Sequence, residues 1–238
     1  MVDNTTRFKA AFNELHKAVA EKVGYSKDTN FGFLLKQADK NDDKVIRSYK
    51  EPLEVLRNFR NLLTHNSLNG ENIAIPSEAL IDEVEHITQK IAHPGKVIDL
   101  FKREVISFDV DDSLTDVLKA VDLNGYSQFP VFNGDKLQGI ISENGITNFL
   151  AKAVDDDVIS ISETTISDVI EKDEEKDSFE IIKENKSIYD IENIFSKRIA
   201  EGKTAFVLLI TSDGHVKRDQ GFKGIITPWD IPTVEANK

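Results

Sequence analysis

Apolar residues recur every three or four positions through most of the first 93 residues, which is the spacing of one face of an amphipathic helix. The pattern predicts four helical segments, at residues 6–24, 31–38, 45–66 and 77–91. Pro52 falls in the third segment, where it either kinks a long helix or begins a new one in its first turn. His93-Pro94-Gly95 ends the last segment. Residues 1–93 are therefore expected to form an all-α helical bundle.

After Pro94 the pattern changes to short apolar strands that alternate with helices, which predicts a second domain over residues 94–238. The order strand, helix, strand, turn, strand, helix occurs twice, in a first motif at about residues 94–154 and a second motif at about residues 165–238. The acidic linker at residues 155–177 is expected to be a solvated loop. The predicted fold class is α+β, with an all-α bundle followed by a tandem of βαββα repeats.

The composition is that of a globular protein, since 39% of the residues are hydrophobic and 30% are charged. The absence of cysteine excludes disulfides, thiol catalysis and cysteine-bound metal sites, and it is typical of a reducing cytosol. The start of the chain lacks the pattern of a signal peptide, and no apolar run reaches the length of about 18 residues that a membrane span needs. We therefore expect a soluble cytoplasmic protein with no membrane segment.

Charge is divided unevenly between the two predicted domains. Residues 1–93 carry 13 Lys and Arg against 14 Asp and Glu, whereas residues 94–238 carry 17 against 28. Because contacts with phosphate backbones need clustered Lys and Arg, the second domain is a poor surface for nucleic acid. No DNA partner is expected, and any RNA contact belongs to the first domain.

The second motif ends in a segment that suits a nucleotide, Gly224-Ile225-Ile226-Thr227-Pro228-Trp229-Asp230. A glycine in the strand lets a flat ligand approach the backbone, and the two isoleucines supply apolar walls. Thr227 and Pro228 begin a helix, whose first amides favour a phosphate. Asp230 can accept hydrogen bonds from both hydroxyls of a ribose. Capping of the helix also explains Thr227 and Asp230, so a structural role stays open. Lys217, Arg218 and Lys223 nearby favour phosphate binding.

Both motifs resemble CBS motifs, and together they resemble the pair called a Bateman module. The first motif carries the resemblance in residues 125–131 and 137–142, and the second in residues 202–207 and 222–230. The resemblance implies a regulatory module that binds an adenine nucleotide, such as AMP, ADP, ATP or a related adenosyl ligand. The residues expected to bind it are Gly224, Ile225, Ile226, Thr227, Asp230, Lys203 and Thr204.

The first motif departs from this pattern. It keeps the hydroxyl at Ser142, but Gly145 stands where the second motif has Asp230. We therefore expect one competent site per chain. Trp229 is expected to be a core or interface residue rather than a residue that stacks on the base.

A second resemblance lies in the third helical segment, where Arg60-Asn61-Leu62-Leu63-Thr64-His65 is similar to the signature of the HEPN domain. In that family Arg, the next polar residue and His form a metal-independent ribonuclease site, usually completed by a second subunit. The resemblance implies catalytic roles for Arg60, Asn61 and His65. A bundle helix that merely ends in polar residues explains the same pattern. The other histidines, His16, His86, His93 and His215, are expected to be surface residues.

Two functions follow from these patterns. In the first, the chain is a regulatory protein without catalytic activity, in which nucleotide binding is transmitted to the helical domain and from there to a protein partner. In the second, the helical domain is a nucleotide-gated, metal-independent endoribonuclease that acts on RNA. Both resembled families commonly associate in pairs, so a homodimer is expected.

Overall fold

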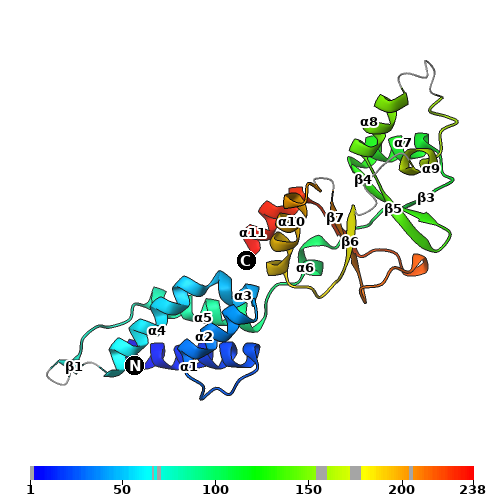
Figure 1. Cartoon of the computed structure of the whole chain (residues 1–238). Coiled ribbons are helices and arrows are strands. Elements are labelled where there is room, and N and C mark those ends of the chain that lie inside the picture. Colours follow the sequence, from blue (N-terminus) through cyan, green and yellow to red (C-terminus); the bar gives the residue numbers. More distant parts are fainter. Residues whose placement is uncertain (1–2, 66, 69–70, 154–159, 172–177, 204–205) are drawn as a thin grey trace. The chain divides into compact units, whose positions relative to one another are not determined.

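The computed structural model describes residues 3–65, 67–68, 71–153, 160–171, 178–203 and 206–238 (Figure 1). The chain divides into two compact units. The first unit comprises Met1–Gly95 and Lys238, and the second unit comprises Lys96–Asn237. None of the helices in the described parts of the chain has the length and apolar character that a membrane span requires.

The first unit is helical. Its elements are α1 (Asn4–Val23), α2 (Phe31–Lys40), α3 (Lys44–Ser48), α4 (Lys50–His65) and α5 (Glu78–Ala92), with the two-residue strands β1 (Ser67–Leu68) and β2 (Glu71–Asn72) between α4 and α5. The third predicted segment is thus two helices, and Pro52 lies in the first turn of α4, where the missing N–H costs no intrahelical bond. The predicted helical character of this part of the chain is confirmed.

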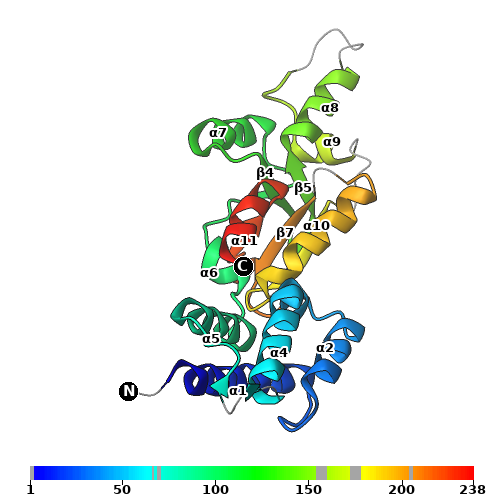
Figure 2. The ribbon, with the colours of Figure 1, turned by 90° about the vertical axis from the view of Figure 1, so that its left-hand side faces the viewer.

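The core of the first unit lies along α1, which packs against α5, α2 and α4 (Figure 2). Phe8 and Phe12 are buried on α1, and their rings contact Phe59 at 5.2 Å and Phe31 at 5.0 Å between ring centres. Asp3 caps α1 by accepting the amides of Thr5 and Thr6, and Ser77 caps α5 in the same way. The apolar stripes read from the sequence are the faces that meet in this core.

The second unit contains two similar series of elements. The first series is α6 (Val97–Phe101), β3 (Phe108–Asp109), α7 (Leu114–Asn124), β4 (Gln128–Asn133), β5 (Lys136–Ser142) and α8 (Glu143–Ala153). The second is α9 (Ile166–Glu171), β6 (Phe179–Lys183), the 3₁₀ turn η2 (Ile188–Asp190), α10 (Ile191–Ala200), β7 (Val207–Thr211), η3 (Arg218–Gln220), β8 (Gly224–Ile226), η4 (Pro228–Asp230) and α11 (Ile231–Asn237).

Each motif has one three-stranded sheet, and the two sheets share a topology. In the order β3-β4-β5 the first pair of strands is parallel and the second pair is antiparallel, and the order β6-β7-β8 repeats this arrangement. The predicted order of strand, helix, strand, turn and strand therefore occurs twice in the structure.

Two short helices were missed by the sequence analysis, and each packs on the motif to which it does not belong in sequence. The start of α6 is held by the second motif, because the amide of Val97 donates to the carbonyl of Lys186 at 2.9 Å. In the same way, the amide of Ile166 at the start of α9 donates to the carbonyl of Asp112 at 2.9 Å. Ile166 and Val169 are buried in the core of the first motif. Part of the expected solvated linker is thus a packed helix, which corrects that prediction.

The two motifs also contact each other through their sheets. Ile140 of β5 packs with Val207 and Leu209 of β7 in one buried cluster. Arg218 crosses between the motifs, where it pairs with the Asp109 carboxylate and donates to the carbonyl of Gly134 at 2.5 Å. The hydrogen bond from Arg218 lowers the pKa of the Asp109 carboxyl below its ordinary value. These contacts join the two motifs into one unit.

Candidate functional site

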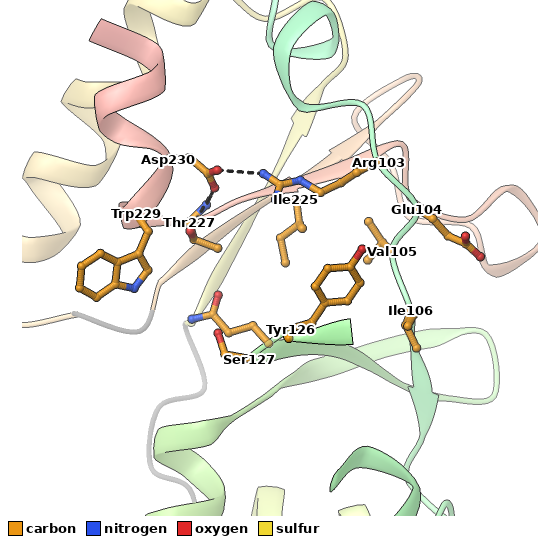
Figure 3. Close-up of a pocket in the computed structure, with 12 residues that line it drawn as sticks. Arg103, Glu104, Val105, Ile106, Tyr126, Ser127, Ile225, Thr227, Trp229 and Asp230 are labelled. Carbon is orange, nitrogen blue, oxygen red and sulfur yellow. Dashed lines mark hydrogen bonds and ion pairs between the residues drawn. The ribbon is translucent and has the colours of Figure 1, made fainter. Parts of the chain in front are cut away.

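A cavity of about 240 Å³ lies between the two motifs, and residues of both line it (Figure 3). The first motif contributes Arg103, Glu104, Val105 and Ile106 from the segment between α6 and β3, Gly125, Tyr126 and Ser127 from the segment between α7 and β4, and Gln128 from the start of β4. The second motif contributes Ile225, Thr227, Trp229 and Asp230 around the end of β8. We call this the inter-motif cavity. Its volume is close to the lower limit, about 300 Å³, of typical small-molecule sites.

Asp230 and Thr227 form a closed turn on one side of this cavity. One carboxylate oxygen of Asp230, Oδ2, accepts the Thr227 backbone N–H at 2.8 Å and the Thr227 hydroxyl at 3.0 Å. The two residues therefore cap the short helical segment η4, and they also line the inter-motif cavity. Capping and ligand contact are compatible at this turn, because a carboxylate has about four acceptor positions.

Arg103 occupies the other carboxylate oxygen of Asp230. Its Nη2 donates to Asp230 Oδ1 at 3.0 Å, and the two side chains keep 35% and 20% of their surface exposed (Figure 3). The backbone N–H of Arg103 donates to the carbonyl of Lys223 at 3.1 Å, so the segment runs along β8. Sequence reasoning missed Arg103, because its proximity to Asp230 follows from tertiary packing across 127 positions.

Gly224 has a role different from the one that its sequence context predicts. It is buried outside the lining of the inter-motif cavity, and a Cβ placed on it lies 2.0 Å from the carbonyl oxygen of Phe101. The missing side chain therefore lets the end of α6 approach β8. Among the other predicted residues, Ile225 lines the cavity, Ile226 is fully buried, Lys203 is not in the lining, and Thr204 lies outside the described residues.

The basic residues expected near the phosphate are arranged differently. Arg218 is engaged by Asp109 and Gly134, and Lys217 pairs with Asp213 at 3.6 Å. Neither lines the inter-motif cavity, and nor does Lys223. Arg103 is the basic residue in the described lining, so the electrostatic character of the cavity depends on a residue of the first motif.

Aromatic and amide groups complete the walls. Tyr126, Ile225 and Trp229 line the cavity, and Figure 3 shows Trp229 apart from the other two, beside Thr227. Trp229 is 90% exposed, so it is not a core residue, and the expected place at an interface stays a prediction. The Gln128 side-chain oxygen, Oε1, is buried and has no hydrogen-bond partner among the described residues. An unsatisfied acceptor beside an open cavity is a feature that a ligand donor would relieve.

The corresponding turn of the first motif lacks a carboxylate. Ser142 accepts the backbone N–H of Gly145 at 3.1 Å, which is one of the two contacts in the capping box of the second motif. Gly145, at the position that matches Asp230, has no side chain to bind a ribose. The two motifs therefore differ at the residue on which the expected nucleotide contact depends.

The first unit holds a separate cavity of about 200 Å³, which we call the bundle cavity. Among the residues lining it are His16, Asn30, Arg57, Arg60 and Asn61. Arg60 donates to the side-chain oxygen of Asn61 at 3.4 Å and has no carboxylate partner among the described residues. The third residue of the predicted catalytic set, His65, ends α4, and its side chain lies outside the described residues.

The expectation that His16 is a surface residue is wrong. His16 is half-buried rather than a free surface residue, and its Nε2 lies 2.7 Å from the carbonyl oxygen of Thr29, to which it donates. Its ring contacts the rings of Phe12 and Phe31. A histidine, two arginines and two asparagines thus line the bundle cavity. The other three histidines, His86, His93 and His215, are exposed.

Comparison with known proteins identifies part of the second unit. The family model described as the CBS domain matches residues 97–152. A solved structure of a putative signal-transduction protein with CBS domains from Burkholderia ambifaria is 17% identical, covers 58% of this chain and 87% of its own, and gives a TM-score of 0.42. A putative acetoin utilization protein from Vibrio cholerae is 16% identical, with coverages of 60% and 92% and a TM-score of 0.43.

A third solved structure is the CBS domain of a bacterial CNNM/CorC family Mg²⁺ transporter in complex with ATP. It is 13% identical, covers 60% of this chain and 88% of its own, and gives a TM-score of 0.40. No curated protein matches the chain.

Proposed function

We propose that this chain, which carries a CBS domain at residues 97–152, is a regulatory protein that senses an adenine nucleotide in the inter-motif cavity. The observation that carries the proposal is that Thr227 and Asp230 of the second motif line one cavity together with Arg103 and Tyr126 of the first. CBS domains are commonly regulatory and bind adenosine ligands. The cavity offers the two kinds of surface that such a ligand needs.

The apolar walls suit a flat base. Val105, Ile106 and Ile225 are aliphatic, and Tyr126 adds a partly exposed ring. Aromatic and aliphatic side chains bind flat rings by excluding water from both faces. The buried oxygen of Gln128 is an acceptor, and the exocyclic amino group of adenine is a donor. The unsatisfied acceptor and this donor are complementary, which supports adenine as the base.

The polar side of the cavity suits a ribose and its phosphate. Asp230 accepts hydrogen bonds from hydroxyl groups, and the Thr227 hydroxyl, which donates to Asp230, retains its acceptor lone pairs. Arg103 supplies a positive charge next to that carboxylate. Hydrogen bonds between charged partners are about twice as strong as those between neutral ones. We expect one nucleotide per chain, since Gly145 offers no equivalent carboxylate in the first motif.

Chain continuity supports transmission of the bound state to the helical domain. The first unit ends at Gly95, and Arg103, only eight positions later, already lines the cavity. A ligand that restrains this segment acts on the stretch of chain that leads out of the helical domain. We propose that the bundle passes this restraint to a protein partner, within a homodimer in the cytoplasm.

A thermal-shift series tests the proposal. AMP, ADP, ATP and S-adenosylmethionine are compared with GMP at equal concentration. At about 100 times the Kd a ligand adds about 2.7 kcal/mol of stability, which raises the melting temperature of a unit of this size by about 5–10 °C. We expect such a rise with at least one adenine nucleotide and a smaller one with GMP. The absence of any rise with all adenosine ligands contradicts the proposal.

A second candidate function, a metal-independent ribonuclease in the first unit, is favoured by the bundle cavity. Arg60 and His16 bring a guanidinium and an imidazole to one place, where a phosphodiester finds both charge stabilisation and a proton carrier, while Arg57 beside them pairs with Glu54 at 3.5 Å. This candidate predicts cleavage of structured RNA in the presence of EDTA, with a loss of about 100-fold or more in Arg60→Ala and in the variant, His16→Ala or His65→Ala, that removes the proton carrier.

The matched control is His86→Ala, which removes an exposed histidine of the same unit and should leave cleavage unchanged. If the wild-type chain does not cleave RNA with or without adenine nucleotides, the ribonuclease candidate is wrong and the regulatory proposal is unaffected.

A further inference from the structure

The ion pair between Arg103 and Asp230 occupies the carboxylate on which nucleotide binding depends. Asp230 accepts three hydrogen bonds, two from Thr227 and one from Arg103. A carboxylate has about four acceptor positions, so one remains. A ribose diol has two hydroxyls to donate. Full contact with both of them therefore requires Arg103 to leave Asp230.

Arg103 has the freedom to make this move. The backbone of its segment is fixed to β8 by the bond to Lys223 and by the close contact of Phe101 with Gly224. Its side chain is 35% exposed and extends along the inter-motif cavity (Figure 3). The side chain can rotate while the backbone stays in place, so the exchange needs no rearrangement of the fold.

Once separated from Asp230, the guanidinium needs another anion, because an unpaired charge in a partly buried cavity is unfavourable. Glu104 is the other carboxylate in the described lining. Its side chain is exposed and points away from Asp230 (Figure 3). The orientation of Glu104 leaves the guanidinium without a replacement carboxylate close to Asp230, and a ligand phosphate is the anion that can take that place.

We propose that Arg103 exchanges Asp230 for a phosphate of the ligand, so that the site selects phosphorylated adenosine over adenosine itself. This inference rests on the proposed function and adds the chemical class of the ligand. A phosphate both releases Asp230 for the ribose and satisfies Arg103. Adenosine supplies no anion, and the sulfonium of S-adenosylmethionine places a positive charge near the guanidinium. Adenosine 5′-phosphates are the ligands that satisfy both residues at once.

Calorimetric titrations of the full chain with AMP and with adenosine test the exchange in the wild type, in Arg103→Gln and in Arg103→Lys. We expect the wild type to bind AMP at least about 10-fold more tightly than adenosine. Arg103→Gln should bind AMP about 10- to 100-fold more weakly, yet bind adenosine as tightly as the wild type or more tightly, since its Asp230 is free. Arg103→Lys should keep part of the preference for AMP.

The matched control is Arg218→Gln, which removes another ion pair between the motifs, that with Asp109, outside the cavity lining. It should leave the ratio of AMP to adenosine affinity unchanged. Equal weakening of both ligands by Arg103→Gln, or unchanged AMP affinity, overturns the exchange while nucleotide binding stands. If neither ligand binds the wild type, the proposed function fails, and the exchange fails with it.

Discussion

Gly224→Ala is expected to destabilise the second unit by about 3 kcal/mol, near the upper end of the usual range for overpacked cores. The added Cβ would lie 2.0 Å from the Phe101 carbonyl oxygen, far inside van der Waals contact. The obstructing atom belongs to the backbone, so no side-chain rotation relieves the clash. Urea unfolding followed by circular dichroism measures the effect.

Gly139→Ala is the matched control for this substitution. Gly139 holds the same place in the first motif, before a pair of isoleucines, and no described atom lies within 4 Å of a Cβ built on it. Its substitution should change stability by less than about 1 kcal/mol. Equal effects of the two substitutions would contradict the account of Gly224 as the point where α6 approaches β8.

Asp230→Ala is expected to weaken AMP binding by about 100-fold or more. The substitution removes the acceptor for two ribose hydroxyls, and hydrogen bonds to a charged group contribute about 1.5–3 kcal/mol each. It also removes the cap at Thr227, which costs about 1 kcal/mol of stability. Circular dichroism and urea unfolding establish that the variant is folded before its Kd is measured by calorimetry.

The control for this loss is Asp213→Ala. Asp213 is an exposed carboxylate of the same motif, pairs with Lys217 and does not line the inter-motif cavity. Its removal should leave the Kd for AMP within about twofold. A similar loss in both variants would mean that general electrostatics or stability, rather than a contact at Asp230, governs the affinity.

Those parts of the fold that follow from local patterns were predictable. Helix periodicity gave α1, α2 and α5, and the alternation of strands with turns gave β4, β5 and β7. The short helices α6 and α9 were not predicted, because five or six residues carry too little periodicity. Their apolar residues, such as Val97 and Ile166, are explained only by the opposite motif on which they pack.

The candidate site likewise contains some residues that could be predicted from the sequence and others that could not. Thr227 and Asp230 are three positions apart on one turn, so their proximity could be predicted from local geometry. Arg103 and Gln128 come from another motif, and neither belongs to a pattern that links it to Asp230. Gly224 was assigned to ligand contact from the sequence. A glycine in a strand is common where a ligand approaches the backbone and also where another part of the backbone does so, and only the position of Phe101 distinguishes the two cases.

In the bundle cavity, too, only the residues that are neighbours in the sequence could be predicted to lie together. Arg60 and Asn61 are adjacent on α4, and their pairing was accessible from the sequence. His16 reaches the same cavity from α1. Its position in the sequence is that of an ordinary residue at the edge of the buried face of α1, so the sequence does not mark it as part of a site. Its bond to Thr29 depends on the loop between α1 and α2, whose path no periodic pattern describes.

Calorimetric titration of the wild-type chain with AMP is the most direct test of the central claim, because it gives both affinity and stoichiometry. The account predicts saturable binding of one AMP per chain, since Asp230 has no counterpart at Gly145. No saturable heat, or two equivalent sites per chain, would contradict it.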